Sequence, residues 1–149
     1  MRQDVEIFVE ICREDVILPQ YAREGDAGMD VRAACSLTLS PLSSGIVPTG
    51  LKVAIPEGYE IQVRPRSGLS LKTNLRIPNA PGTIDSGYRD EIGIIVYNCS
   101  PTESLTINKG DRVAQFVLQR VPTIQFVPVA NVSDIGTNRG GGFGSTGKE

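Results

Sequence analysis

The chain consists largely of short segments in which apolar side chains recur at every second position, the pattern of β-strands with one buried face. The first of these, VEIFVEI at 5–11, places Val, Ile, Val and Ile on one side. Turn sequences such as PTG at 48–50 and KGD at 109–111 separate the segments. Many short strands with turns at near-regular spacing predict an all-β sandwich or barrel. The further segments that we expect to be strands are 51–55, 59–64, 92–98, 105–107, 113–120 and 123–129.

Only one segment, residues 67–74, could form a helix. Ser67 could cap its first turn, whereas Gly68 and the short length limit the helix to about two turns. We therefore expect one short helix in an otherwise all-β fold.

The last part of the chain differs from the rest. After residue 120 it becomes an extended apolar stretch and ends in the glycine-rich segment 138–149, which is expected to have little structure of its own. A length of 149 residues favours one domain. We expect this domain to comprise a β-core over 1–120 and an extended arm over 121–149.

Composition and charge restrict the partners. No apolar run approaches the roughly 20 residues of a membrane span, and acidic residues interrupt the first ten positions, unlike a secretory signal. A net charge of −2 and a pI near 5.2 argue against non-specific nucleic-acid binding, which needs a basic face. We therefore expect a cytoplasmic protein without a nucleic-acid or membrane partner.

The absence of His restricts the chemistry. It excludes Ser–His and Cys–His catalysis and His-ligated zinc. The spacing of Cys12, Cys35 and Cys99 fits no metal or redox motif, so we expect three buried, small apolar residues. If the chain is an enzyme, its base is expected to be a carboxylate.

Two motifs could bind an anion. In RPRSGLS at 64–70, Arg66, Ser67 and Gly68 could bring a guanidinium, a hydroxyl and backbone N–H groups together, although a capped surface turn explains the same residues equally well. In the segment 138–149, consecutive glycine N–H groups could surround phosphate oxygens, with Arg139 supplying charge. This segment also has the spacing of a dinucleotide fingerprint, but the match is false because no helix follows it in this chain.

Three further motifs contain candidate polar groups. In GTIDSGYR at 82–89 two glycines bracket an expected hairpin, where Asp85 could take a proton from water and the Tyr88 ring could support a flat or sugar-like ligand. A turn Asp and a packing Tyr are the commoner explanation. Asp30, in GDAGMD, could hold Mg²⁺ through water or cap local backbone. Gln115, in GDRVAQ, lies on an expected strand, where a polar side chain is usually satisfied by its neighbours.

Taken together and in this order, PRSGLS, GTIDSGYR, GDRVAQ and RGGGFGSTG resemble the signature segments of the deoxyuridine triphosphate nucleotidohydrolase (dUTPase) family, and the likeness extends over residues 25–147. The resemblance implies a jelly-roll subunit and a homotrimer with active sites shared between chains. It also implies hydrolysis of dUTP to dUMP and pyrophosphate by water attack on the α-phosphorus, with Mg²⁺ on the phosphates. Such an activity would limit uracil incorporation into DNA and supply dUMP for dTMP synthesis.

The resemblance also suggests individual roles. By position, Asp85 resembles the water-activating carboxylate, Tyr88 the ring beneath deoxyribose, and Asp30 the carboxylate linked to Mg²⁺ through water. The other positions resemble nucleotide contacts: the uracil edge for Asn79, Thr83 and Ile84, the phosphates for Arg66, Ser67, Gly68, Arg139 and Ser145, and a lid over uracil for Phe143 with Gly144. Gln115 resembles a contact to a phosphate or to water.

Two other functions remain open from the sequence. A dCTP deaminase, or a bifunctional deaminase and dUTPase, would share the fold and the phosphate-binding logic. Such relatives are expected to lack the spacing between Asp85 and Tyr88 and the Phe143 lid. A nucleotide-binding trimer without turnover is the third possibility, which the intact Asp85 disfavours.

Overall fold

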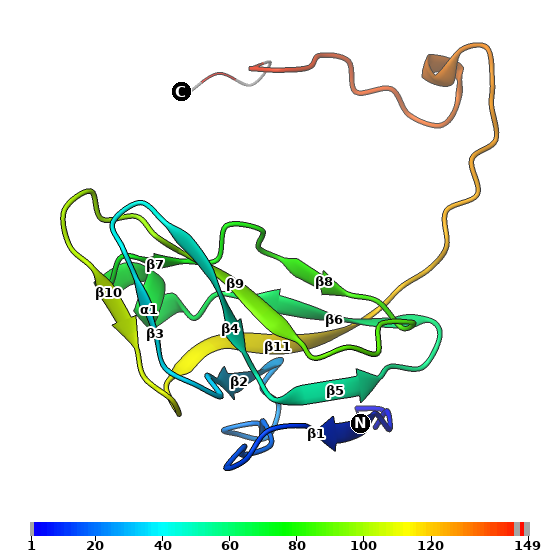
Figure 1. Ribbon diagram of the computed structural model, residues 1–149. Helices are drawn as coiled ribbons and strands as arrows, with labels where there is room; N and C mark the ends of the chain where they lie inside the picture. Colours follow the sequence, from blue (N-terminus) through cyan, green and yellow to red (C-terminus); the bar gives the residue numbers. More distant parts are fainter. Residues whose placement is uncertain (1, 145–146, 148–149) are drawn as a thin grey trace.

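The computed structural model describes residues 2–144 and 147 of the chain (Figure 1). Within that part, eleven strands, one α-helix and one short 3-10 helix make up the regular structure. The helix α1 spans Ser67–Lys72, and the 3-10 helix η1 spans Val132–Asp134. The strands are β1 (Phe8–Ile11), β2 (Gly28–Arg32), β3 (Leu37–Leu39), β4 (Ser44–Pro48), β5 (Leu51–Ala54), β6 (Tyr59–Arg64), β7 (Leu75–Arg76), β8 (Gly82–Ile84), β9 (Gly93–Asn98), β10 (Leu105–Ile107) and β11 (Arg112–Arg120).

The strands pair antiparallel in four sheets. The largest has the order β2-β11-β6-β8, the next β4-β9-β7, and two pairs, β1-β5 and β3-β10, complete the set. The long strand β11 is central to the largest sheet, because it pairs with β2 on one side and with β6 on the other. The fold is therefore an all-β, jelly-roll-like sandwich with one short helix, and the fold class predicted from the sequence is confirmed.

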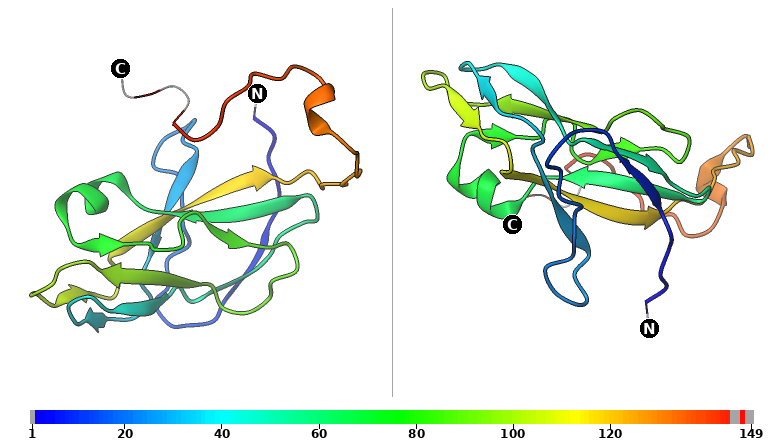
Figure 2. Two further views of the ribbon diagram at one scale, coloured as in Figure 1. Left: turned by 90° about the horizontal axis from the view of Figure 1, so that it is seen from above. Right: turned by 60° about the horizontal axis from the view of Figure 1, so that its bottom comes forward.

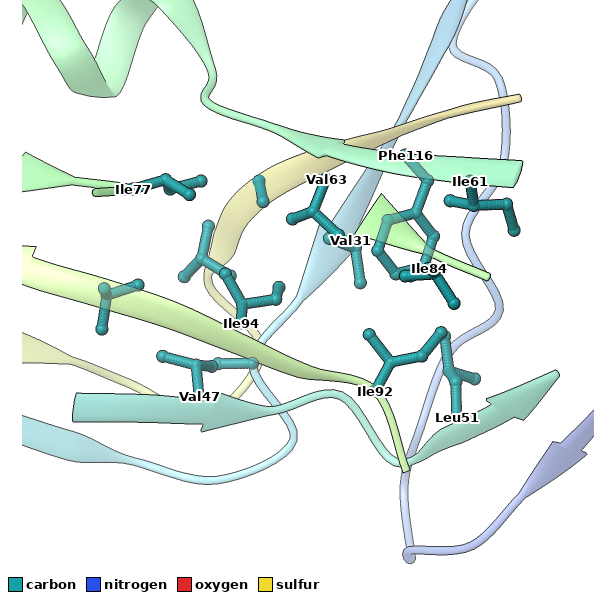
Figure 3. Packing of buried hydrophobic residues seen from close by; sticks show 14 of the residues in the cluster. Val31, Val47, Leu51, Ile61, Val63, Ile77, Ile84, Ile92, Ile94 and Phe116 are labelled. Carbon is teal, nitrogen blue, oxygen red and sulfur yellow. The ribbon is translucent and has the colours of Figure 1, made fainter. Parts of the chain in front are cut away.

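The hydrophobic core lies between the two larger sheets. Figure 3 shows Val31, Val63 and Phe116 of the four-stranded sheet pointing toward Val47 and Ile94 of the three-stranded one. Side chains on a strand alternate between its faces, so the period-two pattern of the sequence places one set in this core and the other outside. Full burial of a Val or Ile contributes about 1.5–3 kcal/mol, and this layer is the rigid support for the loops at the ends of the sheets.

Most of the predicted strands are confirmed. The segments predicted at 51–55, 59–64, 92–98, 105–107 and 113–120 match β5, β6, β9, β10 and β11 to within one residue at either end. The first predicted strand is shorter than expected, because only its second half pairs, as β1 with β5.

Two local predictions are wrong. The segment 123–129 forms no strand: it pairs with nothing in the described part of the chain, and its side chains are exposed. A strand needs a neighbour for its backbone hydrogen bonds, and the alternation alone cannot supply one. Ser67 does not cap α1, because Arg66 occupies the N-cap position with an extended backbone and makes no side-chain cap bond.

The cysteines are only partly as expected. Cys12, Cys35 and Cys99 are free thiols, but each is partly exposed rather than buried. In the part of the chain that the structure describes, no helix is long and apolar enough to span a membrane. The cytoplasmic location expected from the sequence stays a prediction.

Candidate active site

Asp30, Arg66 and Gln115, which we call the Arg66 cluster, come together although they are far apart in the sequence. The register of β11 sets Gln115 opposite Asp30 on one side and opposite Arg64 on the other. Arg66 Nε donates to Asp30 Oδ1 at 3.0 Å, and Gln115 Nε2 donates to the carbonyl oxygen of Pro65 at 3.0 Å. All three side chains are partly buried. The cluster is therefore held by the sheet register and by its own hydrogen bonds.

Arg66 also contacts the backbone of β11. Its Nη1 donates to the carbonyl oxygen of Arg112 at 3.4 Å, and Arg112 lies opposite Arg32 in the β11–β2 register. Ser67 and Gly68 follow Arg66 directly at the exposed start of α1. A guanidinium fixed by hydrogen bonds to a carboxylate and a backbone carbonyl oxygen, with an exposed hydroxyl next to it, suits a phosphate ligand.

Gly28 was not among the predicted site residues, yet it makes room for the cluster. A Cβ at this position would overlap Oε1 of Gln115, so the Gln115 side chain lies directly over the glycine backbone. A shallow hollow of about 310 Å³ is lined there by residues that include Asp26, Asp30 and Gln115. The sequence carried no clear signal for this role, because no strand was predicted over residues 28–32.

Residues 85–91, which we call the Asp85 loop, make up all but the last residue of the connection from β8 to β9. The predicted hairpin is wrong, because β8 pairs with β6 and β9 pairs with β4 and β7. The loop therefore crosses from one sheet to the other. The main-chain N–H of Tyr88 donates to the Asp85 carbonyl oxygen at 3.1 Å, and Tyr88 Oη donates to the carbonyl oxygen of Glu91 at 2.9 Å. The Asp85 side chain is exposed, and so is the ring of Tyr88, at 40%.

The segment that leads into this loop contains the other predicted base-binding residues. A Cβ at Gly82 would lie 3.4 Å from Asn79 Nδ2, so the exposed Asn79 side chain stands over the start of β8. Along β8 the Thr83 side chain faces outward, while Ile84 is buried in the core. Asn79 and Thr83 therefore lie along the edge strand β8 of the four-stranded sheet, and Asp85 and Tyr88 follow in the loop that leaves this edge.

The structure does not bring this edge together with the Arg66 cluster in one chain. Ile84 pairs with Ile61 in the antiparallel register of β8 and β6. Asp85 is one residue past this pair toward one end of the sheet, and Arg66 is five residues past it toward the other end. At about 3.3 Å per residue, their backbones are about 20 Å apart along the strands. Figures 1 and 2 show α1 and the loop after β8 at opposite ends of the molecule.

The arm carries the remaining predicted contacts away from both groups. After β11 it leaves the sheets and runs apart from them (Figures 1 and 2), and its described side chains are all exposed. Arg139, Phe143 and Gly144 lie in this exposed part. Ser145 lies outside the described residues.

Glu91 and Arg13 are two further residues that were not predicted. Arg13 Nε donates to both carboxylate oxygens of Glu91, at 2.9 and 2.7 Å. The hydrogen bond from Arg13 lowers the pKa of Glu91 below its ordinary value, and the same contact raises the pKa of Arg13. No sequence motif indicates this contact, because the two residues are 78 positions apart.

The fold, the Arg66 cluster and the exposed Asp85 and Tyr88 agree with a comparison of the sequence with known families. In that comparison the dUTPase model matches residues 14–147. The chain belongs to the dUTPase family. Arg13 lies just outside the matched residues.

Individual dUTPases resemble the chain over nearly its whole length. The deoxyuridine 5'-triphosphate nucleotidohydrolase of Fusobacterium nucleatum is 53% identical over 146 residues, covering 95% of this chain and 98% of the relative. That of Streptomyces coelicolor is 46% identical and covers 98% and 79%. A Staphylococcus bacteriophage 80alpha dUTPase, solved with dUpNHpp, has a TM-score of 0.86 at 28% identity and covers 96% and 99%. A dUTPase from phage phi11 of S. aureus, described with a structural Mg(II) ion, has a TM-score of 0.78 at 28% identity and covers 86% and 99%.

Proposed function

We propose that the chain hydrolyses dUTP to dUMP and pyrophosphate. The observation that carries this proposal is membership of the dUTPase family, with 53% identity over 146 residues to the F. nucleatum enzyme. The Arg66 cluster and the Asp85 loop add the physical support. The Arg66 cluster offers a fixed guanidinium for a triphosphate. The Asp85 loop offers an exposed carboxylate and an exposed aromatic ring. The product dUMP would serve dTMP synthesis, and removal of dUTP would limit uracil incorporation into DNA.

Asp85 is proposed as the general base that takes a proton from the water attacking the α-phosphorus. A chain without His leaves a carboxylate as the natural candidate, and Asp85 is open to solvent. Tyr88 is proposed to lie beneath the deoxyribose. Asn79, with the backbone of Thr83 and Ile84, is proposed to read the uracil edge, because a fixed backbone presents a fixed pattern of donors and acceptors.

The phosphates are assigned to the Arg66 cluster and the arm. Arg66, with Ser67, Gly68 and Gln115, would hold the triphosphate and stabilise the charge that develops in the transition state. Arg139 and Ser145 would contact the far end of the triphosphate. Phe143 with Gly144 would close over the base and exclude water.

Mg²⁺ is the proposed cofactor, and the residues present fit it. Mg²⁺ keeps several waters and is usually bound by one or two carboxylates together with substrate phosphates. Asp30 offers one such carboxylate, partly buried beside Arg66, and the hollow next to it also contains Asp26. When bound, the ion would draw charge from the phosphate oxygens. Asp30 would hold it through water, while Arg66 keeps the Asp30 side chain oriented.

A homotrimer with shared active sites is also proposed. Within one chain the Asp85 loop and the Arg66 cluster are about 20 Å apart, so a complete site needs a second copy. An apolar hollow of about 1180 Å³, lined by residues that include Val53, Phe116 and Leu118, opens between the N-terminal segment and β6 and β11. The described part of the arm pairs with no strand and carries exposed apolar side chains, such as Phe126 at 86% exposure. A copy that covers this hollow could also carry its arm to a neighbouring site.

The proposal is tested by measuring pyrophosphate release from dUTP, UTP, dTTP and dCTP, each with and without Mg²⁺. Of the four nucleotides, we expect only dUTP to release pyrophosphate. We expect this release to be much faster with Mg²⁺ than without it. Release of ammonia from dCTP would instead favour a dCTP deaminase or a bifunctional enzyme. Nucleotide binding without pyrophosphate or ammonia would favour a non-catalytic trimer and overturn the proposed hydrolysis.

A further inference from the structure

The Asp85 loop is fastened at its far end by an ion pair that neither the sequence motifs nor the proposed roles use. Arg13 Nε reaches both oxygens of the Glu91 carboxylate, at 2.9 and 2.7 Å. The main-chain N–H of Gly50 donates to Glu91 Oε2 at 3.3 Å. Glu91 thus joins the loop to two other parts of the chain, the end of β1 and the turn between β4 and β5.

These parts are themselves connected at the same place. The main-chain N–H of Cys12 donates to the carbonyl oxygen of Gly50 at 2.8 Å, so the backbone beside Arg13 is fixed on the β4–β5 turn. Next to Glu91, the buried Ile92 accepts hydrogen bonds from Thr49 through both the main-chain N–H and Oγ1. The ion pair therefore adds a side-chain constraint at the point where the loop enters the rigid part of the fold.

The constraint extends from Glu91 to the ring of Tyr88. Tyr88 Oη donates to the carbonyl oxygen of Glu91 at 2.9 Å, so the position of the Glu91 backbone determines where the hydroxyl end of the ring is held. The other end of the residue is fixed by the hydrogen bond from its main-chain N–H to the Asp85 carbonyl oxygen. With both ends held and 40% of the residue exposed, the ring presents a rigid, accessible surface.

We propose that Arg13 and Glu91 are positioning residues that hold the Tyr88 ring where it admits a 2′-deoxyribose and rejects a ribose. This inference rests on the proposed function, in which Tyr88 lies beneath the sugar. A ring that cannot move away leaves no space and no partner for a 2′-hydroxyl, whereas a ring that yields tolerates it. Loosening the ion pair should therefore increase the use of UTP more than it lowers the use of dUTP.

The selectivity test uses Arg13→Ala and Glu91→Gln. The Arg13 side chain is 45% exposed, so its removal leaves the core intact, and Glu91→Gln keeps the shape of the side chain while removing its charge. In both variants we expect the ratio of kcat/KM for dUTP to that for UTP to fall about three- to tenfold, with kcat for dUTP within about twofold. The double variant should lose no more than the larger single loss, because both changes break one contact.

Asp15→Asn is the matched control. It removes one negative charge two residues from Arg13 and breaks a different ion pair, that of Asp15 with Lys109. Asp15 has a φ of 58°, a conformation that Asn also tolerates. The control should keep the wild-type selectivity, and Arg13→Lys, which keeps the charge but loses the planar fork, should lie between wild type and Arg13→Ala.

A second readout needs no turnover. Amide hydrogen exchange over residues 85–91 should be about tenfold faster in Glu91→Gln than in wild type and unchanged in Asp15→Asn. Unchanged exchange in Glu91→Gln, or a selectivity ratio that stays at the wild-type value in both variants, would overturn the positioning role. Failure of the wild-type chain to hydrolyse dUTP would instead overturn the proposed function, and the exchange rates would still decide whether the ion pair holds the loop.

Discussion

The Arg66 cluster and the Asp85 loop are built in different ways. In the cluster the functional side chains hold one another, since Arg66 and Asp30 form a partly buried ion pair and Gln115 is bonded to the backbone before Arg66. In the loop Asp85 is exposed, and the Tyr88 ring is fixed by backbone atoms and, through Glu91, by an ion pair outside the site.

This difference indicates which half of the site is ready before a ligand arrives. Charges fixed in advance stabilise a transition state without the cost of reorganisation, and the Arg66 cluster has this property within one chain. The Asp85 loop presents its carboxylate to solvent, about 20 Å from the cluster. Each half should therefore fail separately when mutated, and the two halves should combine only between copies.

The largest expected effect is that of Asp85→Asn. Loss of a general base lowers turnover by about 100- to 10,000-fold, while the Arg66 cluster, left intact, keeps the affinity for the triphosphate. Pyrophosphate release measures the first quantity, and calorimetry with a non-hydrolysable dUTP analogue measures the second. Asp90→Asn, in the same exposed loop, is the matched control and should remain active. Near-wild-type hydrolysis by Asp85→Asn would remove the base from the mechanism.

The second prediction concerns mixed oligomers of Asp85→Asn and Arg66→Ala, each of which should be nearly inactive alone. If every site takes its loop from one copy and its cluster from another, random mixing in equal amounts gives intact sites at about a quarter of positions. Activity should therefore return to about a quarter of wild type after the two variants are unfolded and refolded together. No recovery, with mixed oligomers shown by mass spectrometry, would mean that both halves act within one chain.

Removal of residues 138–149 should have the next largest effect. The described residues of this segment are exposed and do not belong to the hydrophobic core, so the truncated chain should fold and assemble as before. Loss of Arg139 and Phe143 should lower kcat/KM for dUTP by about 100-fold, because the site stays open to water and loses a cation. Steady-state kinetics and sedimentation measure the two properties. Full activity of the truncated chain would exclude the lid.

The sequence predicted the strands well and their partners poorly. Alternation located β6 and β11, because burial of one face imposes a period of two, but the pattern says nothing about which strands pair. The hairpin expected around Asp85 is in fact a crossing between two sheets. Likewise 123–129 has the composition of a strand, but in this chain it lacks a neighbour.

The site residues show the same limit. Motif resemblance predicted Asp30, Arg66 and Gln115, and the structure brings these three together. It could not reveal Glu91 and Arg13, since their role depends on a contact between distant segments. Nor could it reveal Gly28, because the close approach of Gln115 depends on the pairing of β2 with β11.

A smaller effect is expected when one methyl group is added to a glycine beside the Arg66 cluster or to a glycine in the Asp85 loop. Gly28→Ala places a Cβ on Oε1 of Gln115 and should displace that flexible side chain without unfolding the sheet. We expect KM for dUTP to rise about fivefold with little change in melting temperature. Gly87→Ala, in the Asp85 loop, meets no atom within 4 Å and should change KM by less than about twofold. Equal effects of the two substitutions would show that Gln115 does not contact the substrate.

The smallest effect should be the dependence of stability on the protonation of Glu91. Its pKa is lowered in the folded chain, mainly by the hydrogen bond from Arg13, with the charges of Arg13 and Lys52 acting in the same direction. Glu91 therefore adds stability above its ordinary, unfolded pKa and loses this contribution as the pH falls through the lower, folded pKa. The difference in melting temperature between wild type and Glu91→Gln should be greatest near neutral pH and disappear in acid. A difference that stays constant from pH 7 to strongly acid solution would mean that the charge of Glu91 does not hold the Asp85 loop, and the ring of Tyr88 would then depend on backbone contacts alone.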